Sequence, residues 1–414
     1  MPLIGAQREP LPGGQFYRAH WYERGMEHAN PKFASSVRVN SPETSTGRFA
    51  GRREARENGL AVILMEEDLL LLDGVELYME VWGGHPGTAK KRVSVNGRST
   101  YPLPDDGVAE GRCAFTYPLL PLALNDVVNG YNALQFACDQ GTTFWGHFMV
   151  DNAVLLALLN PTHPDIKSYG LADFNPVLRA ETASDAERIT LELDVPESVY
   201  DHIDMVHFQG RYRGYNENGS MQDDVWHGIT KDRQPVAMLG KADSPPYRIS
   251  WDVSMLPDQQ DMAVRAHISF KEQDNLHFRT AALEGLATPE RAAHVSHFRT
   301  TESPVPFWSR AGREKTGVID MPIPPEQIER AVLHMAVWDG GRGSIEHPVL
   351  LNGHPVEVAG SGKHEKIYRV LELDPDLLIE GANTVTVISD TEHHGIEVLL
   401  PEPALMVRYP RKID

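Results

Sequence analysis

Cysteine is nearly absent from this 414-residue chain, which contains only Cys113 and Cys138. Two cysteines exclude a disulfide scaffold and a zinc site with four cysteine ligands. The chain also lacks any run of about 18 consecutive apolar residues, the length that a membrane-spanning helix requires. Lys and Arg total 39 against 58 Asp and Glu, for a net charge of −19. With no basic run, this balance argues against nucleic acid and anionic membranes as partners.

Familiar catalytic motifs are missing as well. There is no G-x-S-x-G nucleophile motif, and no H-x-x-x-H zinc pattern on a predicted helix. No basic stretch followed by an apolar stretch comes after Met1, so we expect a cytoplasmic protein, or a secreted one if a leader has been removed. A homo-oligomer could form through an exposed sheet face.

Proline and glycine, in contrast, are plentiful, with 30 and 34 residues. Few long helical periods occur between them, which indicates many short strands joined by turns. Both cysteines lie in strand-like runs, so we expect buried free thiols. The sequence therefore predicts an all-β protein.

An internal repeat is the strongest signal in the chain. Similar alternating segments end in Trp82 and Trp338, and an Asn-Gly pair follows each tryptophan after fourteen residues. A Gly-x-Asn segment then leads into a further alternating run in both halves. The repeat predicts two copies of one β-domain, at 59–165 and 305–410. We interpret the shared glycines and asparagines as turn and scaffold residues.

Between the copies lies a different unit, at 180–300, whose alternating runs predict further strands. Before the first copy, residues 1–58 are polar and irregular. We expect this segment to be an arm laid across the body of the protein. Its apolar anchors would be Phe16, Tyr17, Trp21 and Tyr22.

The repeated pattern of a strand ending in tryptophan, an Asn-Gly turn and a Gly-x-Asn strand resembles the galactose-binding-type jelly roll. The central segments 203–208, 246–252, 256–258 and 262–266 resemble the bacterial immunoglobulin-like domain. These resemblances imply two related jelly-roll β-sandwiches flanking an immunoglobulin-like β-sandwich, with the irregular N-terminal arm. They also imply a carbohydrate-related function, because such modules accompany carbohydrate-active enzymes.

An inserted loop at 210–233 departs from the immunoglobulin-like pattern, and long loops in compact domains are often functional. Its aromatic rings could stack on a sugar while its amides and carboxylates bind hydroxyl groups. The candidate catalytic residues are Tyr212, Asp223, Asp224 and His227. The candidate substrate-binding residues are Arg211, Tyr215, Asn216, Asn218 and Trp226, with Trp145 and His147 from the rim of the first copy. The alternative is a loop that packs on a neighbouring domain, anchored by Trp226.

A second candidate is the pair His393 and His394, near the end of the second copy. Adjacent histidines with nearby carboxylates could bind a divalent metal ion, the one cofactor to which the sequence points. Neighbours in a strand face opposite sides, however, so exposed loop histidines are the competing interpretation. Nearby Glu392 and Glu397 form one of many carboxylate pairs that could serve a glycosidase.

The leading hypothesis is an enzyme that cleaves a glycosidic bond in a small glycoside or oligosaccharide. Hydrolysis would require two suitably spaced carboxylates, whereas a lyase would require a base and a group that neutralises a uronate. The alternative is a non-catalytic glycan-binding protein. Its partner in either case would be a carbohydrate.

Overall fold

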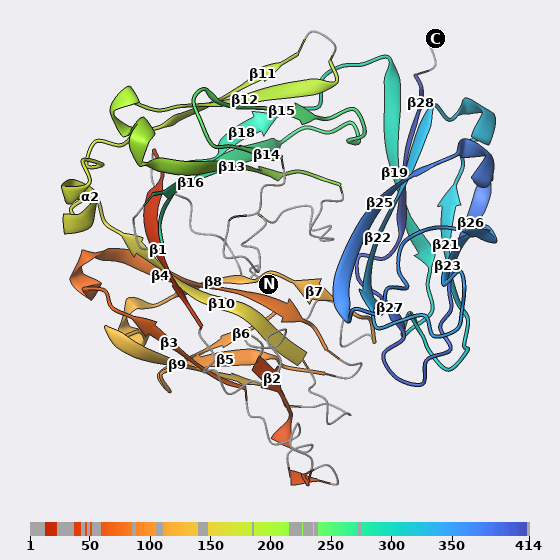
Figure 1. Ribbon diagram of the computed structural model, residues 1–414, viewed down its shortest axis with the longest axis horizontal. Coiled ribbons are helices and arrows are strands. Elements are labelled where there is room, and N and C mark those ends of the chain that lie inside the picture. The colour runs from red at the N-terminus through yellow and green to blue at the C-terminus, as the bar shows by residue number, and fades with distance from the viewer. Residues whose placement is uncertain are drawn as a thin grey trace.

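The computed structural model describes residues 13–22, 37–42, 46–47, 50–51, 59–84, 88–104, 111–139, 148–183, 186–214, 226, 235, 239–271 and 275–411. These residues form an all-β protein, as predicted, built of sandwiched antiparallel sheets (Figure 1). No helix among them is long and apolar enough to cross a membrane. Both cysteines are free and buried, which confirms that expectation.

The first repeat copy consists of two sheets that face each other across an apolar core. One sheet contains β3 (Leu60–Met65), β9 (Gly130–Ala137), β5 (Arg92–Val95) and β6 (Ser99–Pro102). The other contains β1 (Gln15–Trp21), β2 (Val37–Val39), β4 (Leu72–Trp82), β7 (Phe115–Thr116), β8 (Leu119–Leu122) and β10 (Phe148–Leu159). Short helices η3 (Leu69–Leu71), η4 (Leu124–Asp126) and α2 (Pro164–Ser168) connect the strands.

The central unit shares a sheet with the first copy. Strands β13 (Ile203–Arg211), β14 (Gly240–Ala242), β16 (Met262–Phe270), β17 (Leu276–Arg279) and β18 (Leu283–Leu286) continue the sheet of β1, β10 and β4 to eleven strands. A three-stranded sheet packs against them, with β11 (Val177–Thr182), β12 (Arg188–Asp194) and β15 (Tyr247–Asp252). The helix η5 (Glu197–His202) precedes β13.

The second copy has its own core, and its ten described strands are connected in one sheet that has two parts. One part contains β21 (Lys315–Met321), β26 (Gly381–Val387), β23 (Val349–Leu351) and β24 (His354–Pro355). The other contains β19 (Ala293–Glu302), β20 (Trp308–Ser309), β22 (Arg330–Asp339), β25 (Glu365–Leu373), β27 (Ile396–Val398) and β28 (Ala404–Pro410). Helices η6 (Pro325–Gln327) and η7 (Pro375–Leu377) complete it.

The Asn-Gly pairs have the same environment in both copies. Asn96 and Asn352 both have φ of 50°, the left-handed conformation that a tight hairpin needs. The side-chain amide of Asn96 donates to Asn132 Oδ1 at 2.9 Å, and that of Asn352 donates to Asn383 Oδ1 at 2.8 Å. These asparagines hold a turn, η4 or η7, and the following strand together, in keeping with the scaffold interpretation.

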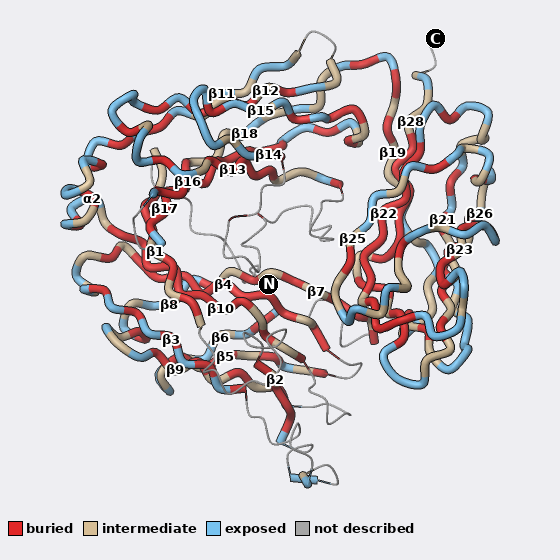
Figure 2. Tube along the Cα trace, in the orientation of Figure 1, coloured by how far each residue is buried: buried red, intermediate tan, exposed pale blue. Residues whose placement is uncertain are grey.

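The sequence predicts an irregular N-terminal segment, but part of this segment forms a central strand. Strand β1 pairs with β10 on one side and with β17 on the other, so it joins the first copy to the central unit. Most of its residues are buried, on both faces of the sheet (Figure 2). Because neither face is solvent-exposed, β1 lacks the polar and apolar alternation by which a half-buried strand is recognised.

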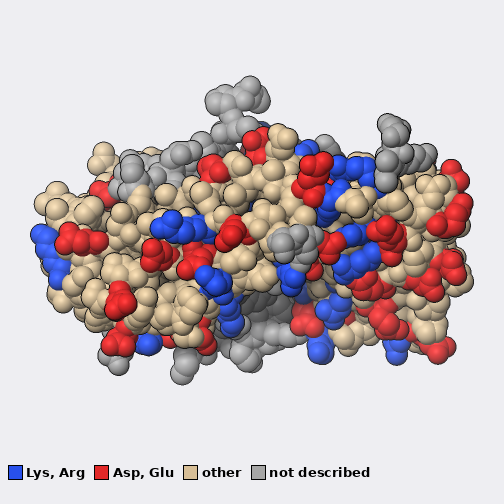
Figure 3. All heavy atoms as spheres, turned by 90° about the horizontal axis from the view of Figure 1, so that it is seen from above, with Lys and Arg blue, Asp and Glu red and all other residues tan. Residues whose placement is uncertain are grey.

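The second copy also contacts the first. Cys113 forms an isolated parallel bridge with Leu399, and the Leu400 amide donates to the Cys113 carbonyl at 2.7 Å. The Lys366 ammonium donates to the Tyr117 hydroxyl and lies 4.8 Å from the Phe115 ring centre. On the face seen in Figure 3, basic and acidic side chains are interspersed.

Candidate functional site

Charged and polar side chains are buried on the face of the eleven-stranded sheet that lies opposite its apolar core. We call this the inner face. On β16, Val264, Ala266 and Ile268 belong to the core, so the alternating residues between them point to the inner face. The inner-face cluster consists of Tyr17, Glu76, His207, Gln209, Arg265, His267, Ser269, His277 and Arg279, all of them buried.

Cross-strand pairing brings the cluster together. His207 lies opposite His267, which lies opposite Arg279 on the next strand. Tyr17 lies opposite His277, so the polar row continues from the central unit onto β1. Directly opposite residues on antiparallel strands have Cβ atoms about 4.5–5.5 Å apart, which is why these side chains meet.

Tyr17 and His267 form a hydrogen-bonded pair at the middle of the cluster. The Tyr17 hydroxyl is 3.2 Å from His267 Nδ1, and the Tyr17 ring stacks on His277 with centroids 5.1 Å apart. Burial raises the pKa of Tyr17. Burial, together with Arg265 and Arg279, holds the pKa of His267 well below its ordinary value. Both groups are therefore neutral at pH 7, and within the described residues His267 Nε2 has no hydrogen-bond partner.

An ion pair crosses the inner face from the central unit to the first copy. Arg279 on β17 contacts Glu76 on β4, at 3.2 Å and 3.4 Å for the two oxygens. Both side chains are buried, with 6% and 3% of their surface exposed. Nearby, Ser269 Oγ is 3.1 Å from His277 Nδ1, and burial lowers the pKa of His277 to about 4.

Arg265 is the second guanidinium of the cluster. Its Nε donates to Gln209 Oε1 at 3.1 Å, and its guanidinium carbon lies 4.2 Å from the centre of the Trp226 ring. Arg211 approaches the same ring at 5.4 Å but forms an ion pair with Glu284 at 2.8 Å. In the described part of the chain, no carboxylate lies within ion-pairing distance of Arg265. Burial and Arg279 lower its pKa.

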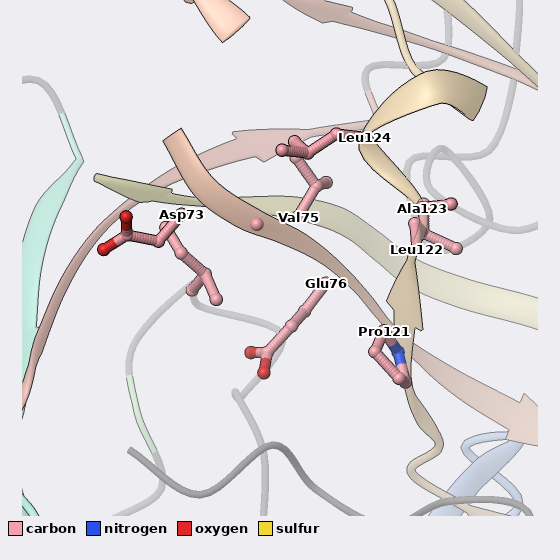
Figure 4. Close-up of a pocket in the computed structure, with 9 residues that line it drawn as sticks. Asp73, Val75, Glu76, Pro121, Leu122, Ala123 and Leu124 are labelled. Carbon is pink, nitrogen blue, oxygen red and sulfur yellow. The ribbon is translucent and has the colours of Figure 1, made fainter. Parts of the chain in front are cut away.

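A cavity of about 280 Å³ adjoins the cluster at the ends of β4, β8 and β10. Glu76 belongs both to the cavity wall and to the ion pair. Figure 4 shows Asp73 and Glu76 on β4 at one side and the 121–124 segment at the other. The cavity therefore combines an apolar wall with two carboxylates.

Three residues of the predicted insertion site are described. Trp226 is buried over Arg265, and Arg211 lies beside it, so both join the inner-face cluster. Tyr212 points to the other side and packs on Trp251 in the core, with ring centroids 5.3 Å apart. The remaining predicted site residues lie outside the described residues: Trp145, His147, Tyr215, Asn216, Asn218, Asp223, Asp224 and His227.

His393 and His394 lie together in an exposed loop with ring centroids 6.5 Å apart, and His364 approaches His394 at 4.8 Å. Within the described ranges, no group of three or more His, Cys, Asp or Glu side chains could hold a metal ion. Burial raises the pKa of nearby Glu397 to about 7, while Arg310 and the hydrogen-bonded Cys113 thiol oppose that rise.

Sequence reasoning did not identify the inner-face cluster as a site. Its members alternate with apolar residues on β16 and β17, a pattern that normally indicates a solvated strand face. One signal was present: on these strands the alternate positions hold histidine and arginine in succession, at Arg265 and His267, and at His277 and Arg279.

Comparisons with known proteins give weak similarity. No protein-family model matches the sequence, and a search of curated proteins finds no match. Among solved structures, the chain is 16% identical to a β-porphyranase of glycoside hydrolase family 86 from the human gut bacterium Bacteroides plebeius, over 58% of this chain and 37% of that one, with a TM-score of 0.25. It is 11% identical to BuGH86 in complex with neoagarooctaose, over 56% and 33%, with a TM-score of 0.24.

A β-glucuronidase from an uncultured Clostridium sp. is 9% identical over 75% of this chain and 50% of its own, with a TM-score of 0.19. The chain thus spans between a third and a half of the length of these structures.

Proposed function

We propose that this protein is a carbohydrate-active enzyme that cleaves a glycosidic bond in a small oligosaccharide, with the inner-face cluster as its site. The observation that carries the proposal is the Tyr17–His267 pair. A neutral phenol and a neutral imidazole, hydrogen-bonded at 3.2 Å, lie buried beside an ion pair that reaches a cavity.

The pair can move protons in both directions. When His267 carries its proton on Nδ1, it donates to Tyr17 Oη and keeps the Nε2 lone pair available as a base. The Tyr17 hydroxyl remains protonated and can act as an acid. Such acid–base catalysis by positioned side chains typically contributes about 10²–10⁴-fold to a rate.

The dimensions of the cavity favour a small ligand. Its volume of about 280 Å³ is close to the lower end of small-molecule sites, roughly 300–1,000 Å³. Carboxylates that fix hydroxyl groups, and an apolar wall that packs on the ring, are what a sugar requires. This supports a substrate of one or two sugar rings inside the site.

A non-catalytic glycan-binding protein is the second candidate. Of the whole cluster, only Glu76 lines the cavity, and Tyr17 is 1% exposed. A ligand confined to the cavity would then contact Glu76 without contacting Tyr17. This arrangement favours binding without turnover.

The test is a screen of the purified protein against a panel of glycosides and oligosaccharides, with products identified by mass spectrometry, with and without a chelator. We expect a cleavage product, which Tyr17→Phe and His267→Gln reduce by about 10²-fold or more. The second copy offers a matched control, because His334 Nδ1 is hydrogen-bonded to the Tyr368 hydroxyl at 2.5 Å. Tyr368→Phe should leave turnover unchanged. Binding without any product would instead favour the second candidate.

A further inference from the structure

The part of the inner-face cluster around Arg265 has more positive than negative charge. Two guanidinium groups, Arg265 and Arg279, are buried there, and Glu76 is the carboxylate that neutralises one of them. The histidines add no charge at pH 7, because burial holds the pKa values of His267 and His277 below their ordinary range. One buried positive charge is left without a negative partner in the described part of the site.

Arg265 carries that charge. Its contacts are the neutral Gln209 amide and the face of Trp226. A ring face offsets only part of the cost of removing a guanidinium from water. Glu76 also acts on Arg265 electrostatically, but its two oxygens lie against Arg279. An anionic ligand would complete the pairing, and a planar carboxylate matches the guanidinium with two parallel hydrogen bonds.

The positions of the cavity carboxylates favour elimination over hydrolysis. A hydrolase would use two carboxylates, and those that line the cavity are Asp73 and Glu76. Since both oxygens of Glu76 lie against Arg279, this carboxylate is poorly placed to attack a sugar or to activate water. An elimination needs no second carboxylate. It needs a base, an acid and a cation that stabilises the substrate's own carboxylate.

We infer that the substrate carries a uronic acid, whose carboxylate Arg265 binds, and that the Tyr17–His267 pair cleaves it by β-elimination. This inference rests on the proposed function and specifies its substrate class.

The electrons and protons of the step balance without a co-reactant. His267 Nε2 takes the proton from C5 of the uronate, and the C–H electron pair forms the C4=C5 double bond. The bond from C4 to the leaving oxygen breaks, and that oxygen receives the Tyr17 proton. The Nδ1 proton of His267 then passes to Tyr17 through their hydrogen bond, which leaves both groups neutral.

The experiment measures how the wild-type protein cleaves three matched classes of substrate: uronate-containing oligosaccharides, their methyl esters and neutral homologues. We expect only the uronates to be cleaved efficiently. Their products should carry a conjugated double bond, seen as ultraviolet absorbance, and show no mass gain of water. Methyl esterification keeps the shape but removes the charge that Arg265 would bind, so turnover should fall. This arm does not depend on any variant folding.

A variant supplies the second arm. Arg265→Gln should lower kcat/KM for uronates by about 10²-fold, because it removes the guanidinium that would pair with the buried carboxylate of the substrate. The control is Arg330→Gln in the second copy, whose guanidinium pairs with Glu372 at an exposed site. We expect it to behave as wild type.

The outcomes separate the two proposals. Cleavage of the neutral homologues with gain of water, unaffected by Arg265→Gln, would overturn this inference and leave the proposed function standing. Loss of that activity in Asp73→Asn would then identify the hydrolytic pair. No cleavage of any carbohydrate would overturn both.

Discussion

The buried ion pair between Arg279 and Glu76 provides a quantitative test of how the inner face is held together. Replacing Glu76 by Gln leaves the Arg279 guanidinium in a site where its side chain is only 6% exposed. Breaking a buried pair in this way costs about 3–5 kcal/mol. Because the contacts of 3.2 Å and 3.4 Å are longer than the roughly 2.7–2.9 Å of strong charged hydrogen bonds, we expect the lower end, about 3 kcal/mol.

Two comparisons isolate the charge effect. In Glu76→Leu combined with Arg279→Met, neither charge remains, so most of the lost stability should return. Glu372→Gln breaks an Arg–Glu pair of the same chemistry at an exposed position, where side chains are 43% and 59% exposed. Exposed pairs contribute about 0–1 kcal/mol, so this variant should be nearly neutral.

The assay is urea denaturation with linear extrapolation of the free energy of unfolding. The described residues form two large core clusters, so we expect two transitions, with the effect in the one that reports the first core. If Glu76→Gln proves no more destabilising than Glu372→Gln, the pair is solvated and the account of the inner face as a low-dielectric site is refuted.

Three further predictions follow from the fold and the cluster. Asn96→Ala and Asn352→Ala should each lower stability by about 1–3 kcal/mol, because backbone groups lose their partners, and each should affect the transition of its own copy in thermal unfolding. The pKa values of His207 and His277 are lowered to about 4 by burial, so the unfolded chain binds more protons between that value and its own pKa near 6.5. The free energy of unfolding, measured by urea denaturation, should therefore fall as the pH is lowered from about 6.5 to 4, by up to about 1.4 kcal/mol per histidine and pH unit; a flat profile would contradict the burial. Trp226→Ala should weaken sugar binding measured by calorimetry while circular dichroism stays unchanged, and an unaltered affinity would remove this ring from the site.

The repeat and the class of fold could be predicted because they depend on local signals. Asn352 and Gly353 connect paired residues Leu351 and His354, a two-residue hairpin loop as an Asn-Gly pair indicates. The alternating apolar residues that end in Trp338 likewise predict a strand with one face in a core, and β22 is such a strand.

The candidate site could not be predicted from local sequence signals in the same way. Arg279 and Glu76 are 203 positions apart, and neither has a neighbour in sequence that indicates its partner. The polar positions of β16 follow the same period as a solvated strand, and only the three-dimensional arrangement buries them. Trp226 was identified from its chemistry, as an aromatic residue in a long insertion, and it does lie on the cluster.

The position of β1 has a consequence for how the chain is assembled during synthesis. This strand leaves the ribosome before its two neighbours, β10 and β17, which follow more than a hundred and more than two hundred residues later. Until residue 279 has emerged, the backbone N–H and C=O groups along one edge of β1 have no partner, and neither the first copy nor the central unit has a complete sheet. The nascent protein therefore exposes an unpaired strand edge until β17 has emerged, the condition under which edge-to-edge association is most damaging. Because β1 pairs with both units, we expect them to fold in one cooperative step rather than as independent domains.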